Sequence, residues 1–254
     1  MNSRTVQDRT PAHLKIEGLG AGYGAFMVLR DLALEARPGI TVILGPNGAG
    51  KTTFFNALSG VTAPTSGELF ALGDRLTGAR PHRYAQHGIA RTFQTPRVFA
   101  EMSVAANIDF GLQFAGRRRV APPLLKDGAG ILRLIGLADQ AARPAAAITP
   151  SQQRLLEIGM ALATRPQVLL LDEVAAGLTE SEVEAMAQLI RRLRGELELT
   201  VIWIEHAVTT LLRHVERVIV LHQGRKIADG TPVEVVRNPA VVEAYLGDEM
   251  VETT

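Results

Sequence analysis

The stretch "GITVILGPNGAGKTTFFNAL", residues 39–58, decides the fold of this chain. It begins with a short apolar run that leads into glycines, which is typical of a buried strand. It ends in a segment whose pattern predicts a helix. Between the two, Gly45 to Thr53 fit the pattern G-x-x-x-x-G-K-[ST]. A strand, a glycine-rich loop and a helix in this order predict a phosphate-binding loop, and the alternative is a plain glycine turn between two elements.

The residue types of this loop suit an anion. Glycines have no Cβ atoms, so backbone N–H groups can wrap phosphates closely, and the start of the following helix favours negative charge. Lys51 is expected to place its ammonium between a β- and a γ-phosphate, and Thr52 to offer its hydroxyl to Mg²⁺. The predicted nucleotide-binding residues of the loop are Gly45, Asn47, Gly48, Ala49, Gly50, Lys51, Thr52 and Thr53.

The C-terminal part of the chain alternates between two patterns. Apolar runs of strand length at 167–173 and 200–206 are each followed by a helical pattern, at 179–197 and 207–215. A hairpin-like segment at 217–230 and a short terminal helix come last. Strands that alternate with helices predict a mainly parallel sheet covered on both faces.

The earlier parts of the chain differ from this pattern. Residues 13–26 and 28–36 alternate with period two, as half-buried antiparallel strands do. Residues 101–116 and 130–142 are alanine-rich and helix-periodic, and we expect a loop at 117–130 between them. The sequence therefore predicts an antiparallel β-subdomain and a helical subdomain beside the parallel sheet.

Polar residues follow two of the predicted parallel strands. Asp172 and Glu173 end the first apolar run, and His206 ends the second, at the sheet edge where α/β proteins place their sites. Asp172 is expected to hold Mg²⁺ through water, and Glu173 to orient or deprotonate an attacking water. His206 could contact a γ-phosphate or hold that water. The alternatives are two solvated acids and a structural histidine.

Composition narrows the function class. The chain has 254 residues, 46% of them hydrophobic, a formal net charge of +1 and no cysteine. The low charge gives no support to a polyanion binder held mainly by electrostatics, and the lack of cysteine excludes disulfides and thiolate metal sites. No apolar run has the length of a bilayer span. Residues 1–12 are expected to be a disordered lead-in without a secretory signal, so a cytoplasmic protein is the default.

The motifs together resemble a known family. The order of "GPNGAGKTT", "RTFQ", "SQQRLLEIGMAL", "VLLLDE" and "IEH" is similar to that in the nucleotide-binding subunits of ABC transporters, from about residue 14 to residue 247. The segments "GIARTFQTPRVFAEMSVAANI", "AAGLTESE" and "IADGTPVEVVRNPAVVEAYLG" resemble the ATPases of bacterial branched-chain amino-acid uptake systems. Those systems include relatives for amides and aromatic acids.

The resemblance implies an α/β fold of the RecA-like P-loop NTPase class. It implies a mainly parallel sheet with an antiparallel β-subdomain and an inserted α-helical subdomain. We expect a single ABC ATPase domain over 13–254. Its β-subdomain and phosphate-loop core would span 13–94, its helical subdomain with the family's signature 95–165, and the rest of the core with the terminal hairpin and helix 166–254.

The resemblance also implies roles for individual residues. Tyr23 falls where the family stacks an aromatic ring on the adenine of ATP. Gln94 falls where the family links its Mg²⁺ site to the helical subdomain and the membrane partner, with a part in catalysis. His206 falls at the family's switch histidine. ATP and Mg²⁺ are therefore the implied cofactors.

The implied partners are those of a transporter. Two ATP-binding subunits would sandwich two ATP molecules, and we expect a heterodimer, with a homodimer as the alternative. Two integral membrane permease subunits would bind the pair, and a solute-binding protein would act indirectly. No nucleic acid is expected. The chain would then lie peripherally on the cytoplasmic face of the membrane.

One motif departs from the family. The signature usually reads Leu-Ser-Gly-Gly-Gln, and here residues 148–152 read Ile-Thr-Pro-Ser-Gln, so that Ser151 replaces a glycine close to the γ-phosphate. The same stretch predicts a helix start with Thr149 as N-cap, Pro150 at the first position and Gln152 completing a capping box. It is either a capped helix without a further role or a rigid donor to the partner's ATP through Thr149, Ser151 and Gln152. We favour the donor.

Three further departures, Val174, Thr179 and Ala207, remove no group expected to touch phosphate, metal or water. We therefore expect an ATPase that powers solute import. One alternative is a soluble ABC ATPase that is not tied to transport. Another is a nucleotide-dependent switch with weak catalysis, which Ser151 favours and the intact Glu173 and His206 oppose.

Overall fold

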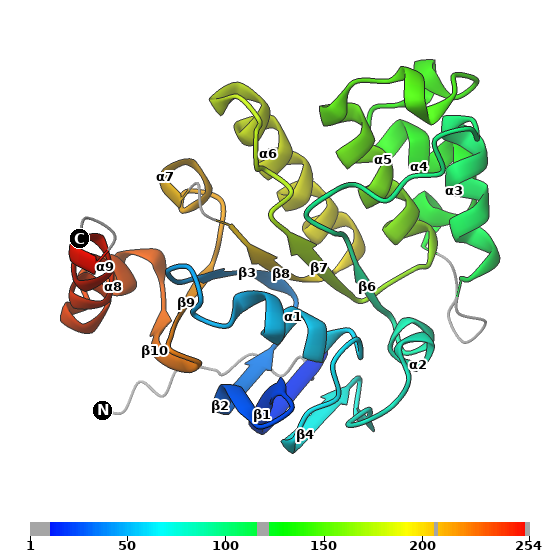
Figure 1. Cartoon of the computed structure of the whole chain (residues 1–254). Coiled ribbons are helices and arrows are strands. Elements are labelled where there is room, and N and C mark those ends of the chain that lie inside the picture. The colour runs from blue at the N-terminus through cyan, green and yellow to red at the C-terminus, as the bar shows by residue number, and fades with distance from the viewer. Residues whose placement is uncertain (1–10, 116–121, 206–207, 252–254) are drawn as a thin grey trace, which may run out of the picture.

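The chain forms two sheets with helices around them (Figure 1). The structure, a computed structural model, describes residues 11–115, 122–205 and 208–251. Most of the predicted lead-in, residues 1–10, lies outside these ranges. Within them, no helix combines the length and apolar character that crossing a bilayer requires.

The larger sheet has six strands in the order β10-β9-β3-β8-β7-β6. All neighbours in it are parallel except β9 and β10, which pair as an antiparallel hairpin. Every residue of β7 and β8 is buried, as expected for parallel strands covered on both faces. The strands are β3 (Gly39–Leu44), β6 (Ile89–Arg91), β7 (Val168–Asp172), β8 (Thr200–Ile204), β9 (Arg217–His222) and β10 (Arg225–Gly230).

The smaller sheet is antiparallel and has four strands in the order β2-β1-β4-β5. Buried Leu14 and Ile16 alternate with exposed Lys15 and Glu17 along β1, which is the period-two pattern predicted from the sequence. The strands are β1 (Leu14–Tyr23), β2 (Phe26–Ala36), β4 (Ser66–Ala71) and β5 (Asp74–Arg75). The mainly parallel sheet and the separate antiparallel sheet confirm the predicted fold class.

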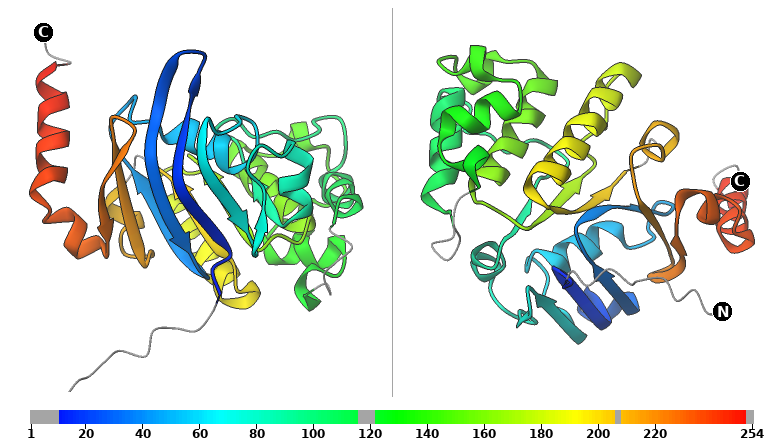
Figure 2. Two further views of the ribbon diagram at one scale, coloured as in Figure 1. Left: turned by 90° about the horizontal axis from the view of Figure 1, so that it is seen from below. Right: turned by 180° about the vertical axis from the view of Figure 1, so that it is seen from behind.

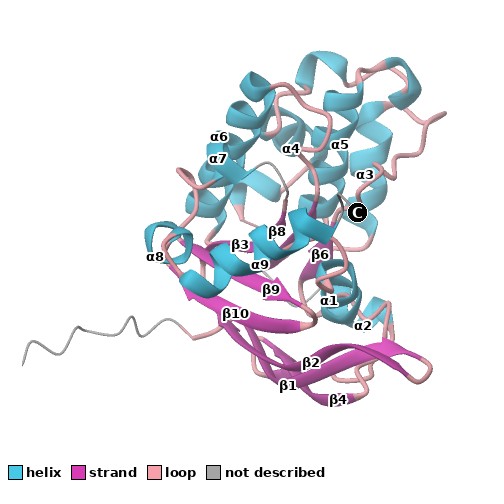
Figure 3. Cartoon of the chain, turned by 60° about the vertical axis from the view of Figure 1, so that its left-hand side comes forward, coloured by secondary structure: helices cyan, strands magenta, loops and turns pink. Residues whose placement is uncertain are grey.

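Helix α1 (Lys51–Leu58) joins the two sheets. It follows β3 and contacts β1 and β2. Its buried Phe54 and Phe55 belong to one apolar core with Leu14 of β1 and Ile43 of β3. In Figure 3 the antiparallel strands lie below α1, and most of the helices lie above the larger sheet. The phosphate loop is therefore supported by both sheets.

The remaining helices lie in groups. Helices α3, α4 and α5 pack against one another, and the described part of 95–165 contains no strand of either sheet. Helix α9 packs against β10 at the edge of the larger sheet, and Figure 2 shows it beside α8 and away from α3, α4 and α5. The helices are α2 (Pro81–Gln86), α3 (Val104–Gln113), α4 (Gly128–Leu134), α5 (Pro150–Ala163), α6 (Glu180–Leu197), α7 (Val208–Leu211), α8 (Pro232–Val236) and α9 (Pro239–Val251).

The start of α5 confirms one local prediction. Thr149 has extended backbone and its hydroxyl accepts from the Gln152 N–H at 3.2 Å, while the Gln152 side chain accepts from the Thr149 N–H at 3.0 Å. Pro150 occupies the first helical position, where its missing N–H is not needed. The predicted capping box is therefore complete.

Two expectations for the middle of the chain were wrong. Helix α4 begins at Gly128, inside the predicted loop, because the Asp127 side chain caps it by accepting from Gly130 N–H at 2.8 Å. The helix expected at 130–142 ends at Leu134, because Gly136 takes a left-handed conformation with φ of 75°. Helix α2 and strand β6 were not predicted.

Candidate functional site

The register of three parallel strands brings the predicted site residues to one edge. Ile204 at the end of β8 lies opposite Ile43 of β3 on one side and Asp172 of β7 on the other. The phosphate loop follows β3, Glu173 follows β7, and Glu205 follows β8. Three loops that carry predicted site residues therefore leave the sheet at the same level, as in other open α/β sheets.

A cavity of about 400 Å³ lies over the phosphate loop. It is lined by Asn47 to Thr53 of the loop, by Glu173, and by Tyr23, Phe26 and Val28 of the antiparallel sheet. The structure thus brings most of the predicted nucleotide-binding residues together with the predicted catalytic acid. Gly45, Gln94 and Asp172 do not line this cavity, but Gly45 and Gln94 each form a hydrogen bond with a residue that does.

Two glycines give the loop its path. Gly45 has φ of 150°, and a Cβ atom there would lie 2.2 Å from the carbonyl oxygen of Leu221 on β9. Gly50 is the N-cap of α1 in the left-handed region, with φ of 101°, and no side chain caps this helix. The first turn of α1 therefore leaves its N–H groups to a ligand.

Lys51 lies folded across its own loop. Its Nζ donates to the carbonyl oxygens of Gly45 at 2.5 Å and Pro46 at 3.0 Å, and the residue is only 7% exposed. Burial lowers the pKa of Lys51, and the nearby Glu173 carboxylate partly offsets this. A phosphate would offer the ammonium a charged acceptor in place of two neutral carbonyls, which makes a stronger hydrogen bond.

Two aromatic side chains form the outer wall of the cavity. Tyr23 is 54% exposed and Phe26 is 72% exposed, at the turn between β1 and β2. The Tyr23 hydroxyl accepts from the Asn56 amide at 3.4 Å, and hydrogen bonds with Thr53 and then Asn56 lower the pKa of Tyr23. Exposed rings at the mouth of the phosphate-loop cavity are suited to stacking on a base. Sequence reasoning found Tyr23 and missed Phe26.

Glu173 is held at its position from two sides. Its backbone is left-handed, with φ of 49°, and its N–H donates to the Ile204 carbonyl at 3.0 Å. The Gln94 amide donates to Glu173 Oε2 at 2.7 Å. The two residues that were predicted to share the catalytic role are thus in direct contact, and the carboxylate faces the cavity that Lys51 also lines.

Asp172 forms a buried ion pair with Arg91. Arg91 Nη2 donates to Asp172 Oδ2 at 2.7 Å, and each side chain is 8% exposed. Arg91 Nη1 also donates to Asn56 Oδ1 on α1 at 2.7 Å and to Oγ of Ser59, the C-cap residue of α1, at 3.0 Å. Arg91 was not predicted, because it and Asp172 stand 81 positions apart and no local pattern links them.

The donor set fits a magnesium ion bound mainly by phosphates and water. Among the described residues, no group of three or more Asp, Glu or His side chains could hold a metal by itself. Mg²⁺ needs fewer, since it keeps several waters and takes one or two protein oxygens beside the substrate phosphates. Of the three residues predicted to supply oxygens, Thr52 lines the cavity, Gln94 contacts Glu173 and Asp172 is paired with Arg91, and their role at a metal stays a prediction.

Glu205 ties two of the loops together. It is 2% exposed, and its Oε1 accepts from the Ala175 N–H at 2.6 Å and from the indole N–H of Trp203 at 3.3 Å. Ala175 belongs to the turn after Glu173, so this contact fixes that turn relative to the end of β8. The predicted His206 and the neighbouring Ala207 lie outside the described residues.

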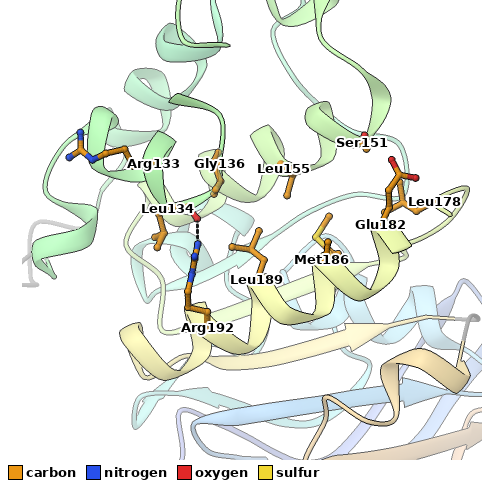
Figure 4. Close-up of a pocket in the computed structure, with 12 residues that line it drawn as sticks. Arg133, Leu134, Gly136, Ser151, Leu155, Leu178, Glu182, Met186, Leu189 and Arg192 are labelled. Carbon is orange, nitrogen blue, oxygen red and sulfur yellow. Dashed lines mark hydrogen bonds between the residues drawn. The ribbon is translucent and has the colours of Figure 1, made fainter. Parts of the chain in front are cut away.

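The signature residues do not reach this chain's own cavity. Thr149 Oγ1 and Ser151 Oγ lie 3.0 Å apart at the start of α5. Ser151 instead borders a second cavity of about 350 Å³ between α4, α5 and α6, where Glu182 faces it (Figure 4). A hydrogen bond from Ser151 contributes to lowering the pKa of Glu182, after those from the Thr179 backbone and side chain.

Comparison with known families agrees with this geometry. A family model described as ABC transporter matches residues 29–176, which include the phosphate loop, Gln94, the signature and the acid pair. The chain belongs to the ABC transporter ATP-binding family. This ABC subunit also matches, over residues 225–251, the model of a branched-chain amino acid ATP-binding cassette transporter.

Relatives of the ABC subunit cover nearly its whole length. It is 36% identical to the high-affinity branched-chain amino acid transport ATP-binding protein BraF of Pseudomonas aeruginosa, over 92% of this chain and 98% of the relative. It is 37% identical to LivG of Escherichia coli, with the same coverage of both chains. A crystal structure of an ATP-binding cassette of an ABC transporter in its ADP conformation superposes with a TM-score of 0.82 at 28% identity, covering 94% of this chain and 100% of the other. Domains of this family hydrolyse ATP, so the ABC subunit is an ATPase.

Proposed function

We propose that this chain hydrolyses ATP at its own phosphate loop to power the import of branched-chain amino acids, or of related amides or acids, by an ABC transporter. The names of the relatives and the match at 225–251 support this substrate class. The observation that carries the catalytic part is the position of Glu173, which faces the phosphate-loop cavity while Gln94 holds its carboxylate at 2.7 Å.

In the proposed mechanism, the loop N–H groups and Lys51 bind the β- and γ-phosphates, and the Tyr23 ring stacks on the adenine. Glu173 accepts a proton from the attacking water or orients it. Gln94 keeps the Glu173 carboxylate directed into the cavity, and His206 contacts the γ-phosphate. Mg²⁺ would be held by Thr52, Gln94 and, through water, Asp172, and when bound it neutralises phosphate charge.

The proposal assigns the start of α5 to a partner's site. Thr149, Ser151 and Gln152 do not line this chain's own phosphate cavity, which supports a role at a nucleotide held by another subunit. Two ATP-binding subunits, expected to be different chains, would enclose two ATP molecules between a phosphate loop and a facing signature. Two membrane permeases, and a solute-binding protein acting on them, would complete the transporter at the cytoplasmic face of the membrane.

Steady-state ATP turnover of the purified chain at high concentration tests the catalytic part. We expect Glu173→Gln to lower turnover by about 10²–10⁴-fold while ATP binding persists, since a general base contributes that much. Glu180→Gln, an exposed acid on α6, is the matched control and should leave turnover unchanged. Equal turnover of the wild type and Glu173→Gln would contradict the proposed role.

A second variant, Ser151→Gly, tests the signature. If identical subunits suffice and serine serves as a donor, the wild type turns over ATP and the variant gains little. If the wild type binds ATP without turnover and Ser151→Gly restores it, the chain depends on a partner with an intact signature. Co-purification with a membrane fraction separates a transporter subunit from a soluble ABC ATPase.

A further inference from the structure

Helix α5 reaches the catalytic turns of its own chain a short distance beyond its signature start. Arg154 and Glu157 stand three positions apart and therefore lie on one face of the helix. This face is directed at β6 and the segment that follows it, where Gln94 is located. Neither residue lines the phosphate cavity, so any effect on chemistry must pass through the backbone that they contact.

Arg154 binds three backbone carbonyls that belong to two different turns. Its Nη1 donates to the carbonyl oxygens of Gln94 at 3.2 Å and Glu173 at 3.3 Å. Its Nη2 donates to the carbonyl oxygen of Ala176 at 2.8 Å. The planar guanidinium therefore fixes the distance between the backbone of Gln94 and the turn that carries Glu173.

Glu157 holds the same segment from the other end. Its Oε1 accepts the N–H groups of Phe93 at 3.3 Å and Arg97 at 3.0 Å, on either side of Gln94. The residue is 5% exposed, and within the described ranges its Oε2 has no hydrogen-bond partner. Burying a carboxylate with one oxygen unsatisfied is unfavourable, so this glutamate is not explained by packing alone.

We propose that Arg154 and Glu157 are positioning residues that hold Gln94 and Glu173 in register for ATP hydrolysis. Through them, the helix whose start faces the partner's ATP is tied to this chain's own catalytic turns. A shift of α5 therefore moves the Gln94–Glu173 contact directly.

A different side of α5 carries Leu155, which follows Arg154 directly in the sequence. There the helix borders the second cavity, with Leu155 facing Met186 and Leu189 of α6 across an open apolar gap (Figure 4). Apolar contacts are non-directional and tolerate sliding better than oriented hydrogen bonds do. The polar face with Arg154 and Glu157 therefore determines how α5 is coupled to the core.

The inference rests on the proposed catalytic function and is tested with kcat and the ATP dissociation constant measured separately. We expect Arg154→Met to lower kcat by about 10- to 100-fold, because small misplacements of catalytic groups have effects of this size, with ATP affinity changed by less than about 2-fold. Arg154→Lys should recover part of kcat, since its ammonium restores a charged donor but not the planar fork of the guanidinium. Arg191→Met, at an exposed arginine on α6 that lines neither cavity, is the control and should behave as wild type.

A double-mutant cycle separates positioning from general stability. If Arg154 acts through Gln94, adding Arg154→Met to Gln94→Ala lowers kcat by no more than about 2-fold further, whereas independent effects would multiply. Glu157→Gln keeps the shape and an acceptor oxygen, so it provides a folded variant for the same cycle. Multiplying effects, or loss of ATP affinity in step with kcat, would overturn the proposal.

The two proposals fail in different ways. If Glu173→Gln turns over ATP as the wild type does, the proposed catalytic role is wrong. If Glu173→Gln abolishes turnover but Arg154→Met matches Arg191→Met, only the positioning role is wrong.

Discussion

Helices α1 and α5 both begin where the family places a phosphate, yet they begin in opposite ways. Helix α1 starts at Gly50 with left-handed backbone and no side-chain cap. Helix α5 starts at Thr149 with a complete capping box and Pro150 in the first turn. The first start leaves its N–H groups for a ligand, and the second satisfies two of its donors internally.

The difference indicates where each helix gets its stability. Phe54 and Phe55 anchor α1 in the apolar core, so its start can remain incomplete until a phosphate arrives. Hydrogen bonds of Thr149 and Gln152 order the start of α5 without any ligand. The phosphate loop is therefore a site that the ligand completes, whereas the signature is a rigid element that is formed in advance.

Gly45→Ala should have the largest effect. The added Cβ would overlap the Leu221 carbonyl, which belongs to the backbone of β9 and cannot rotate away. We expect a loss of about 3 kcal/mol in the free energy of unfolding together with loss of ATP binding. Gly48 also has a positive φ, of 75°, but open space surrounds it. Gly48→Ala should therefore lower the free energy of unfolding by only about 1 kcal/mol. Denaturant unfolding of both variants checks this, and equal losses would contradict the role assigned to the close contact.

Glu157→Gln should change how stability depends on pH. Burial raises the pKa of Glu157 from 4.5 to about 7, against the hydrogen bonds from Arg97 and Phe93 and the charges of Arg154 and Arg97. A raised pKa means that the folded state binds the proton more tightly than the unfolded state. Relative to Glu157→Gln, the free energy of unfolding of the wild type should therefore fall by about 3 kcal/mol as the pH rises from 4.5 to 7. It should fall no further above pH 7. Unfolding curves at several pH values measure the difference, and parallel curves would argue against it.

Tyr23→Ala should weaken ATP binding at the phosphate loop and leave the start of α5 unchanged. Loss of a stacked ring weakens binding by about 1–3 kcal/mol, so the ATP dissociation constant should rise about tenfold or more. Tyr23→Phe keeps the ring and should change the constant little. Titration with ATP measures both, and an unchanged constant in Tyr23→Ala would leave the exposed Phe26 as the base contact.

Thr149→Ala should affect only the start of α5 and leave the phosphate loop unchanged. Losing an N-cap hydroxyl costs about 1 kcal/mol of unfolding free energy, while Thr149→Ser should retain it. ATP affinity of the isolated chain should not change, because Thr149 does not line its own phosphate cavity. A fall in ATP affinity would show that the two helix starts are coupled within one chain.

What could be predicted from the sequence depended on distance along the chain. The phosphate loop and the capping box at Thr149 are specified by residues within a few positions of one another, and both were found as expected. The start of α4 is equally local, but the Asp127 cap follows a proline-rich stretch that favoured a loop.

Contacts between distant segments could not be predicted. The Arg91–Asp172 pair, the exposed Phe26 beside the loop and the bonds of Arg154 to the turn after Glu173 depend on strand order and helix packing. Neither composition nor a local motif indicates which strand ends lie next to one another in the fold. Glu157 is the clearest case, since in the sequence it is an ordinary helix-forming residue and in the fold it is a buried carboxylate.

The contact between Trp203 and Glu205 gives the chain a built-in optical probe. Trp203 is its only tryptophan, fully buried, and donates to the carboxylate that also holds the turn after Glu173. Indole emission responds to nearby charge and hydrogen bonding, so a movement of that turn should change the fluorescence of the unlabelled protein. The binding and release of nucleotide could then be followed in real time by stopped-flow fluorescence, with no engineered label.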